Sequence, residues 1–179
     1  MLGNNLSGKI AIVTGSSRGI GAAIASRLAQ DGASVVVNYA GSADKAEEVV
    51  NTIEASGGRA VAVQADVGKL TDIARLFDET LEKFGKVDIL VNNAGVQAYK
   101  LIADVTEQDF DRLFNTNVKG TFFACQQAAR LMTEGGRIIN STSVTHLMLP
   151  TYSTYAADQR IRRFSPKAKL QNRSNISLK

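Results

Sequence analysis

The first feature with chemical meaning is a glycine loop. Residues 14–21 read TGSSRGIG and directly follow the apolar run 10–13. Gly15 permits a tight turn, Gly19 lets the backbone approach a ligand closely, and Gly21 lets a helix pack against a strand. The N-terminus of the helix that follows offers unpaired N–H groups and a partial positive charge. A strand, a glycine loop and a helix in this order predict a pyrophosphate site, against the simpler alternative of a tight loop.

The second feature is a polar residue on an apolar helix face. Residues 106–132 predict one long helix, which Thr106 and Asp109 begin with the spacing of a capping box. Its apolar stripe consists of Phe110, Leu113, Phe114, Ala124, Ala128 and Leu131. Asn117 falls on this stripe, and a buried polar side chain needs hydrogen-bond partners. Two interpretations of Asn117 stay open, a structural amide and a functional group, whereas Cys125 on the same face is interpreted as a packing residue.

The elements that must position these residues alternate to about residue 155. Apolar runs predict strands at 10–13, 34–37, 60–63, 89–91 and 137–139. Amphipathic stretches predict helices near 19–31, 43–55, 73–84 and 106–132. In the first of these helices, Ile20, Ile24 and Leu28 share a face. Continuous Val and Ile runs between helices are typical of parallel strands buried on both faces, so the sequence predicts a doubly wound α/β sheet of the Rossmann type.

Length and composition limit the class of protein. A chain of 179 residues with 44% hydrophobic and 21% charged residues is typical of one ordinary domain. No apolar run approaches the roughly 20 residues that span a membrane. Residues 1–6 lack the regions of a signal peptide, and a single cysteine agrees with a reducing compartment, so we expect a cytoplasmic protein. His146 is the only histidine and no cysteine cluster accompanies it, so we expect no metal site.

The net charge of +4 is concentrated near one end of the chain. Residues 158–179 hold seven of the 21 Lys and Arg and one of the 17 Asp and Glu, a net charge of +6. Residues 1–157 therefore carry a net charge of −2. The segment 158–179 has no sustained apolar period, and we interpret it as a basic, poorly ordered tail. Few aromatic residues accompany its charges, so we expect no nucleic-acid partner.

Further motifs occur in order behind the glycine loop. They are NNAG at 92–95, NVKG at 117–120, then Ser143 and Tyr155. With these motifs the chain resembles the short-chain dehydrogenase/reductase family over about residues 7–157, and particularly its ketoacyl-carrier-protein reductase and hydroxynaphthalene reductase branch. The resemblance implies that NAD(P)(H) binds across the carboxyl ends of the strands. It also implies hydride transfer to the carbonyl carbon of a small carbonyl compound, or from the corresponding carbon of an alcohol.

The resemblance also implies which residues form the site. The acid–base group would be Tyr155, and Ser143 would hydrogen-bond the substrate oxygen, with Ser141 and Thr142 as neighbours that compete for this role. Asn117 would support a water in the proton relay. The residues expected to hold the cofactor are Gly15, Ser17, Arg18, Gly19, Ile20, Gly21, Asn38, Tyr39, Ser42, Asp66, Val67, Asn92, Ala94 and Gly95. Among them, Asp66 and Val67 would hold the adenine, and those from the NNAG motif would line the ribose side.

The choice of cofactor follows from charge at the end of the second predicted strand. A site for NAD typically places an acid there to accept hydrogen bonds from the ribose 2′-hydroxyl. Asn38 is neutral and does not repel a 2′-phosphate, and Arg18 supplies positive charge for it. Tyr39 and Ser42 add possible donors. We therefore expect NADP(H) rather than NAD(H), the alternative being that Arg18 is a solvated loop charge.

One residue departs from the family pattern. Four residues after the tyrosine the family has a lysine, which lowers the pKa of the tyrosine, and this chain has Gln159. The strands and helices expected beyond Ala157 are also not recognisable. These departures lead to an alternative expectation: 1–157 is an incomplete dinucleotide-binding domain, truncated or frame-altered at 158–179, that binds cofactor with little or no turnover. A family-type homo-oligomer is then possible, but with an impaired interface and an exposed edge at the fifth strand.

Overall fold

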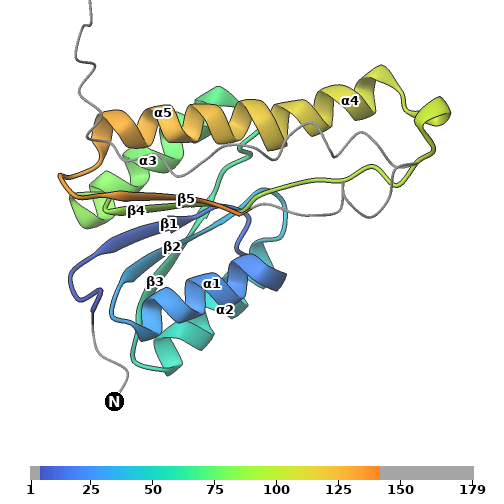
Figure 1. Cartoon of the computed structure of the whole chain (residues 1–179). Helices are drawn as coiled ribbons and strands as arrows, with labels where there is room; N and C mark the ends of the chain where they lie inside the picture. Colours follow the sequence, from blue (N-terminus) through green and yellow to red (C-terminus); the bar gives the residue numbers. More distant parts are fainter. Residues whose placement is uncertain (1–4, 142–179) are drawn as a thin grey trace, which may run out of the picture.

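The structure is a computed structural model that describes residues 5–141, and it contains one parallel sheet. The strands lie in the order β3-β2-β1-β4-β5, and every pair is parallel. Their bounds are β1 (Ile10–Val13), β2 (Ser34–Tyr39), β3 (Arg59–Gln64), β4 (Ile89–Asn92) and β5 (Arg137–Asn140). Each predicted strand is present, and the doubly wound α/β prediction is confirmed (Figure 1).

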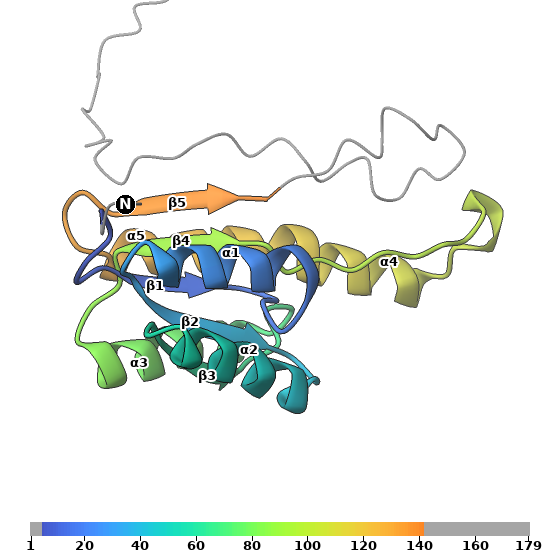
Figure 2. The same cartoon turned by 90° about the horizontal axis from the view of Figure 1, so that it is seen from below.

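Helices cover both faces of the sheet. On one face lie α1 (Gly19–Gln30) and α2 (Ala43–Ala55), and on the other lie α3 (Leu70–Phe84) and α5 (Thr121–Leu131) (Figures 1 and 2). Alternate strand residues supply the two cores: Val13 and Val35 pack toward α1 and α2, whereas Ile12 and Leu90 pack toward α3 and α5. The strands are therefore apolar throughout because both faces are buried.

The apolar face predicted for α1 packs against the core at Ile24 and Leu28 but not at Ile20. The buried residues of the helix are Gly21, Ala25 and Ala29, while Ile20 is 70% exposed. Small side chains at the buried positions let the helix backbone approach the sheet closely, and Ile24 and Leu28 pack beside them. The exposed Ile20 stands instead at the first turn of α1, near the carboxyl ends of the strands.

The predicted helix over 106–132 is continuous but not uniform. It consists of α4 (Glu107–Leu113), a π-helix (Phe114–Gly120, η2) and α5, and a short 3₁₀ helix η1 (Ile102–Asp104) precedes it. The capping box is confirmed, because Thr106 Oγ1 accepts from the Asp109 N–H at 3.2 Å and Asp109 Oδ2 accepts from the Thr106 N–H at 3.1 Å. The α4 end of this helix extends past the carboxyl ends of the strands (Figures 1 and 2). Phe110, predicted on the apolar stripe, is 44% exposed and stacks on Phe114.

A buried carboxylate fastens the amino ends of the central strands. Asp88, 3% exposed, precedes β4 and accepts hydrogen bonds from the Ile10 N–H at 2.9 Å and the Thr133 hydroxyl at 2.9 Å. Lys9 and Lys86 pair with it at 3.3 Å and 3.1 Å. Burial alone would raise the pKa of Asp88, but these hydrogen bonds outweigh it and hold the pKa below its usual value.

The outer strand β5 has one neighbour in the described part of the chain. It pairs with β4, and its Ile139 is 49% exposed. Figure 2 shows β5 along one edge of the sheet. Within residues 5–141, no helix has the length and apolar character needed to cross a membrane.

Candidate functional site

A hollow of about 360 Å³ opens at the carboxyl ends of the strands. Its walls come from the loops after β1, β2, β3 and β4, with Thr116 of the π-helix. The chain winds outward from β1 in both directions here, toward β2 and toward β4, and such a switch point is where open α/β sheets bind ligands. Of the residues predicted to hold the cofactor, all line this hollow except Gly19 and Asn92.

The glycine loop is packed too tightly for side chains at two positions. Gly15 has φ +62°, and a Cβ there would lie 2.8 Å from the Ala94 Cα. A Cβ on Gly21 would lie 2.6 Å from the Gly15 carbonyl oxygen and 2.5 Å from Asn93 Nδ2. These two glycines therefore allow the loops after β1 and β4 to meet. Gly19, with φ +59°, has open space around it, which leaves its backbone accessible.

The N-terminus of α1 is open to an anion. Its N-cap residue is Arg18, which makes no side-chain hydrogen bond to the helix, and its first turn contains no acidic residue. The first N–H groups of a helix have no partner within the helix, and the helix dipole makes this end partly positive. With Ser17 and Arg18 lining the same hollow, the arrangement suits a phosphate group.

Asn38 borders the hollow but its side chain is turned into the protein. The residue is 1% exposed, its Oδ1 accepts from the Gly15 N–H at 3.1 Å, and its Nδ2 donates to the Ala65 carbonyl at 3.0 Å. The sequence analysis expected Asn38 to leave room for a 2′-phosphate because it is neutral, and in this orientation its amide bonds to the protein backbone. Tyr39 and Ser42, which follow, do line the hollow.

The loops after β1 and β4 are held together by two side chains that the sequence analysis missed. Thr14, 2% exposed, accepts with Oγ1 from the N–H groups of Asn93 and Ala94, both at 3.0 Å. Asn93 Nδ2 donates to the carbonyls of Thr14 at 3.0 Å and Gly15 at 3.1 Å. Their position in the sequence could have identified them, because each follows an apolar strand. A polar side chain at such a place needs hydrogen-bond partners, and here the backbone supplies them.

Asn92 lies apart from the hollow. Its Nδ2 donates to Asn140 Oδ1 at 2.9 Å and to Cys125 Sγ at 3.3 Å, so it joins β4 to β5 and α5. Cys125 packs against the core beneath α5, as predicted, and burial raises the pKa of its thiol. The described backbone continues to Ser141, whose N–H donates to the Asn92 carbonyl at 2.8 Å.

Asn117 lies in the π-helix and clamps the loop after β4. Its Oδ1 accepts from the Val96 N–H at 2.9 Å and its Nδ2 donates to the Val96 carbonyl at 3.0 Å. The residue is 7% exposed and both ends of its amide bond to the backbone of Val96, which favours the structural alternative for its side chain. Near it, Gly120 abuts the Val67 carbonyl so closely that no Cβ would fit. Short π-helical segments within α-helices often occur at functional sites.

Asp66, predicted beside the adenine, shapes the loop after β3. Its Oδ1 accepts from the Gly68 N–H at 2.9 Å, and its own N–H donates to Asp72 Oδ2 at 2.9 Å. Asp66 and Val67 line the hollow beside Ala65. Ser143, Tyr155, His146 and Gln159, together with the tail 158–179, lie outside the described residues.

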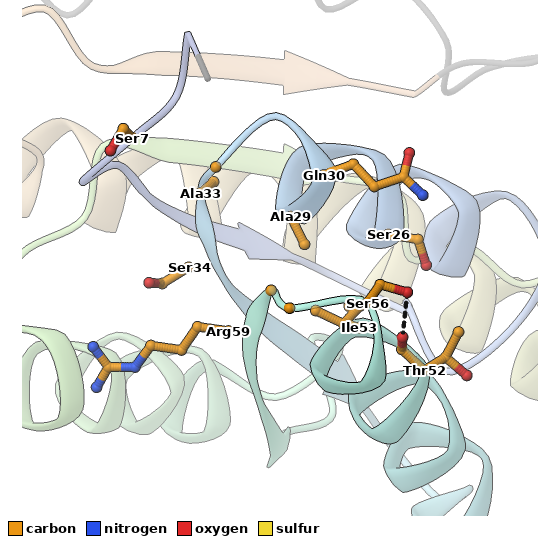
Figure 3. A pocket seen from close by; sticks show the side chains of 13 residues that line it. Ser7, Ser26, Ala29, Gln30, Ala33, Ser34, Thr52, Ile53, Ser56 and Arg59 are labelled. Carbon is orange, nitrogen blue, oxygen red and sulfur yellow. Dashed lines mark hydrogen bonds between the residues drawn. The ribbon is translucent and has the colours of Figure 1, made fainter. Parts of the chain in front are cut away.

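A second hollow of about 400 Å³ lies between the C-terminal ends of α1 and α2 (Figure 3). Small hydroxyl side chains and Arg59 line it, and the Arg59 guanidinium lies 4.8 Å above the Phe84 ring. The Ser56 hydroxyl is bonded to the Thr52 carbonyl at 2.9 Å. Helix C-termini carry partial negative charge, so this end of the sheet does not suit a phosphate. Among residues 5–141, no group of three or more His, Cys, Asp or Glu could hold a metal ion.

Comparisons with known proteins agree with this architecture. The family model described as short chain dehydrogenase matches residues 9–159. A probable tetrahydroxynaphthalene reductase of Zymoseptoria tritici is 44% identical over 158 residues, which are 87% of this chain and 59% of that protein. The crystal structure of a short chain dehydrogenase from Burkholderia cenocepacia in complex with NADP is 47% identical, with a TM-score of 0.82, over 87% of this chain and 64% of that one.

A third similar protein is the angucycline C-6 ketoreductase LanV, solved with bound NADP. It is 46% identical with a TM-score of 0.80, over 86% of this chain and 63% of that one. The chain thus spans about six tenths of the length of these relatives. On the extent of the family match and the shared fold, this chain belongs to the short-chain dehydrogenase/reductase family.

Proposed function

We propose that this chain binds NADP(H) in the hollow at the carboxyl ends of the strands. The hollow itself carries the proposal: it joins an uncapped helix N-terminus, a glycine cradle and the adenine-side loop after β3. Two similar proteins, the Burkholderia cenocepacia dehydrogenase and LanV, were solved with NADP. The part of the wall at the end of β2 contains Asn38, Tyr39 and Ser42 and no acid, so it offers no carboxylate there to repel a 2′-phosphate.

In this proposal, residues from the four loops after β1, β2, β3 and β4 hold different parts of the cofactor. The backbone of Gly15, Gly19 and Gly21 holds the pyrophosphate, as the open N-terminus of α1 favours. Arg18 with Tyr39 and Ser42 surrounds the 2′-phosphate, where a guanidinium can donate two hydrogen bonds. The adenine lies at Asp66 and Val67, and the ribose side is lined by Ala94 and Gly95. In this assignment Asn92 does not line the hollow, and its side chain supports the site by bonding to Asn140 of β5.

The proposed reaction is hydride transfer between the nicotinamide and a carbonyl or secondary alcohol, the chemistry that a bound nicotinamide supplies. Tyr155 gives a proton to the substrate oxygen in reduction and takes it back in oxidation. Ser143 donates a hydrogen bond to that oxygen. Asn117 contributes by fixing the loop at Val96 on the side of the hollow. The single cysteine agrees with a cytoplasmic enzyme. In this proposal residues 1–157 belong to its dinucleotide-binding domain.

A second candidate is a cofactor-binding protein with little or no turnover. The observation that favours it is Gln159, where the family has a lysine. A neutral amide cannot lower the pKa of Tyr155 as a nearby cation does, typically by about 1–3 units. Positioned proton transfer commonly contributes about 10²–10⁴-fold to rate, so the loss of this tuning would leave binding intact and turnover small.

The test is a fluorescence titration with NADPH on the chain and on its Gln159→Lys variant, with turnover of a ketone assayed beside it. We expect both proteins to bind NADPH more tightly than NADH. Turnover by the unmodified chain supports the reductase. Binding without turnover, gained in Gln159→Lys, supports the second candidate. An absence of NADPH binding in a chain with native circular dichroism contradicts both.

A further inference from the structure

We propose that Asn38 is a positioning residue that fastens the glycine loop to the loop after β3, and that it does not select between NADPH and NADH. This proposal rests on the proposed cofactor. It separates two roles that share the end of β2: Asn38 sets the shape of the site from inside the protein, and its neighbours on the wall of the hollow meet the ligand.

The contacts of Asn38 link three strand ends. Its Oδ1 accepts from the Gly15 N–H at 3.1 Å, and its Nδ2 donates to the carbonyls of Ala65 at 3.0 Å and Val63 at 3.3 Å. Its own backbone carbonyl accepts from the Ser16 N–H at 2.8 Å. At 1% exposure, no water competes for these groups. One side chain therefore joins the loop after β1 to the end of β3.

The chemistry of the partners requires an amide. The Gly15 N–H can only donate, and the Ala65 and Val63 carbonyls can only accept. A buried side chain at this place must accept at one end and donate at the other, which asparagine does. An ionised aspartate has the same shape but only accepts, so both carbonyls would lose the Nδ2 donor and face a negative charge.

The clamp connects the two halves of the proposed site. Gly15 opens the loop assigned to the pyrophosphate, and Ala65 immediately precedes Asp66 and Val67, assigned to the adenine. Loosening the clamp should weaken every dinucleotide alike, because the pyrophosphate and the adenine are common to NADP and NAD. A residue that touched the ribose would instead change the two affinities in opposite directions.

The experiment measures the affinities for NADP⁺ and NAD⁺ by calorimetry in four variants. Asn38→Asp removes the donor, and Asn38→Thr keeps a smaller hydroxyl that suits a strand and preserves folding. Tyr39→Asp places a carboxylate on the wall of the hollow for comparison. Asn51→Asp adds the same charge on the exposed surface of α2, as the matched control.

We expect Asn38→Asp to weaken both dinucleotides by about tenfold or more, and Asn38→Thr to weaken both by less, with the ratio of the two affinities changed less than about threefold. Tyr39→Asp should shift that ratio toward NAD⁺, and Asn51→Asp should leave both affinities unchanged. Burial raises the pKa of a carboxyl, and a protonated carboxyl can donate to Ala65. The loss in Asn38→Asp should therefore be smaller near about pH 5.5 than near about pH 7.5.

The proposal is overturned if Asn38→Asp weakens NADP⁺ while NAD⁺ binds as before or better, or if neither Asn38 variant loses affinity. If the unmodified chain binds no dinucleotide, the proposed function fails by itself. Amide hydrogen exchange then decides the role of Asn38: faster exchange at Gly15 in Asn38→Thr, with α3 unchanged, supports the clamp, and unchanged exchange at Gly15 overturns it.

Discussion

The two ends of the sheet are both fastened by buried polar side chains, but with different chemistry. At the carboxyl end, Thr14, Asn38, Asn93 and Asn117 are neutral and bond to the backbone of the loops. At the amino end, the carboxylate of Asp88 gathers two lysines, a hydroxyl and an N–H group. A carboxylate beside the bound phosphates would repel them, whereas the far end of the sheet can carry one. Asp66, which also lines the hollow, lies on the side assigned to the adenine.

The comparison suggests that the two fastenings have separable effects. Those at the carboxyl end shape the walls of the hollow, so their loss should reduce both stability and dinucleotide binding. Asp88 lies at the opposite end of β4, so its loss should reduce stability alone. Three substitutions test this distinction.

The largest effect is expected from Thr14→Val, which has nearly the same shape. It removes the acceptor of the Asn93 and Ala94 N–H groups and leaves both without a partner. Unfolding free energy should fall by about 3 kcal/mol, and NADPH affinity should fall with it. Urea unfolding and an NADPH titration measure the two. Thr14→Ser keeps the hydroxyl and should retain most of both, and binding that persists in a destabilised Thr14→Val would contradict the coupling.

A smaller effect is expected from Asp88→Asn. It keeps an acceptor for the Ile10 N–H but loses the charge that pairs with Lys9 and Lys86, whose side chains are 46% and 38% exposed. Solvent screens such pairs, so unfolding free energy should fall by only about 1–2 kcal/mol. NADPH affinity should stay unchanged, and a parallel loss of affinity would show that the two ends are coupled.

Asp88 also gives this variant a pH signature. The folded-state pKa of Asp88 lies below the unfolded value of about 3.9. The stability contributed by its charge is therefore present above the unfolded pKa and is lost as pH falls through the folded pKa. The difference between the unmodified chain and Asp88→Asn should be constant above about pH 5 and shrink below about pH 4. A difference that grows in acid would refute this account.

The smallest effect is expected from Arg59→Ala in the second hollow. The change removes the guanidinium that lies over Phe84 at an exposed position. Unfolding free energy should fall by about 0.5–1 kcal/mol, measured by urea unfolding, with no change in NADPH affinity. Arg59→Lys should restore part of the loss. A change in NADPH affinity would show that the second hollow influences the proposed site.

The parts of the fold that the sequence predicted well depend on local pattern. Strands such as β2 are continuous Val runs, and the helix α2 was predicted with its observed bounds. The glycine loop was also recognisable, because Gly15, Gly19 and Gly21 meet backbone requirements that few other residues meet. The NNAG motif was recognisable by its sequence. The capping box at Thr106 followed from spacing alone.

The errors concern directions and distances that pattern does not contain. Ile20 was grouped with Ile24 and Leu28, which do pack against the core, but Ile20 itself is 70% exposed because the first turn of α1 borders the hollow. The π-helix at Phe114–Gly120 could not be predicted, since its extra residue per turn depends on what Asn117 and Gly120 meet in the neighbouring loops.

The order of strands and helices along the chain, the glycine loop and membership of the family follow from residue types at fixed spacing, so they could be predicted without a structure. The direction in which side chains point at the hollow depends on tertiary packing. Asn38 and Tyr39 are adjacent, and a strand turns successive side chains to opposite sides. The side that faces the ligand depends on where β1 and β3 end. In the folded protein Gly15 and Ala65 lie at the two ends of the Asn38 amide, so Asn38 faces inward.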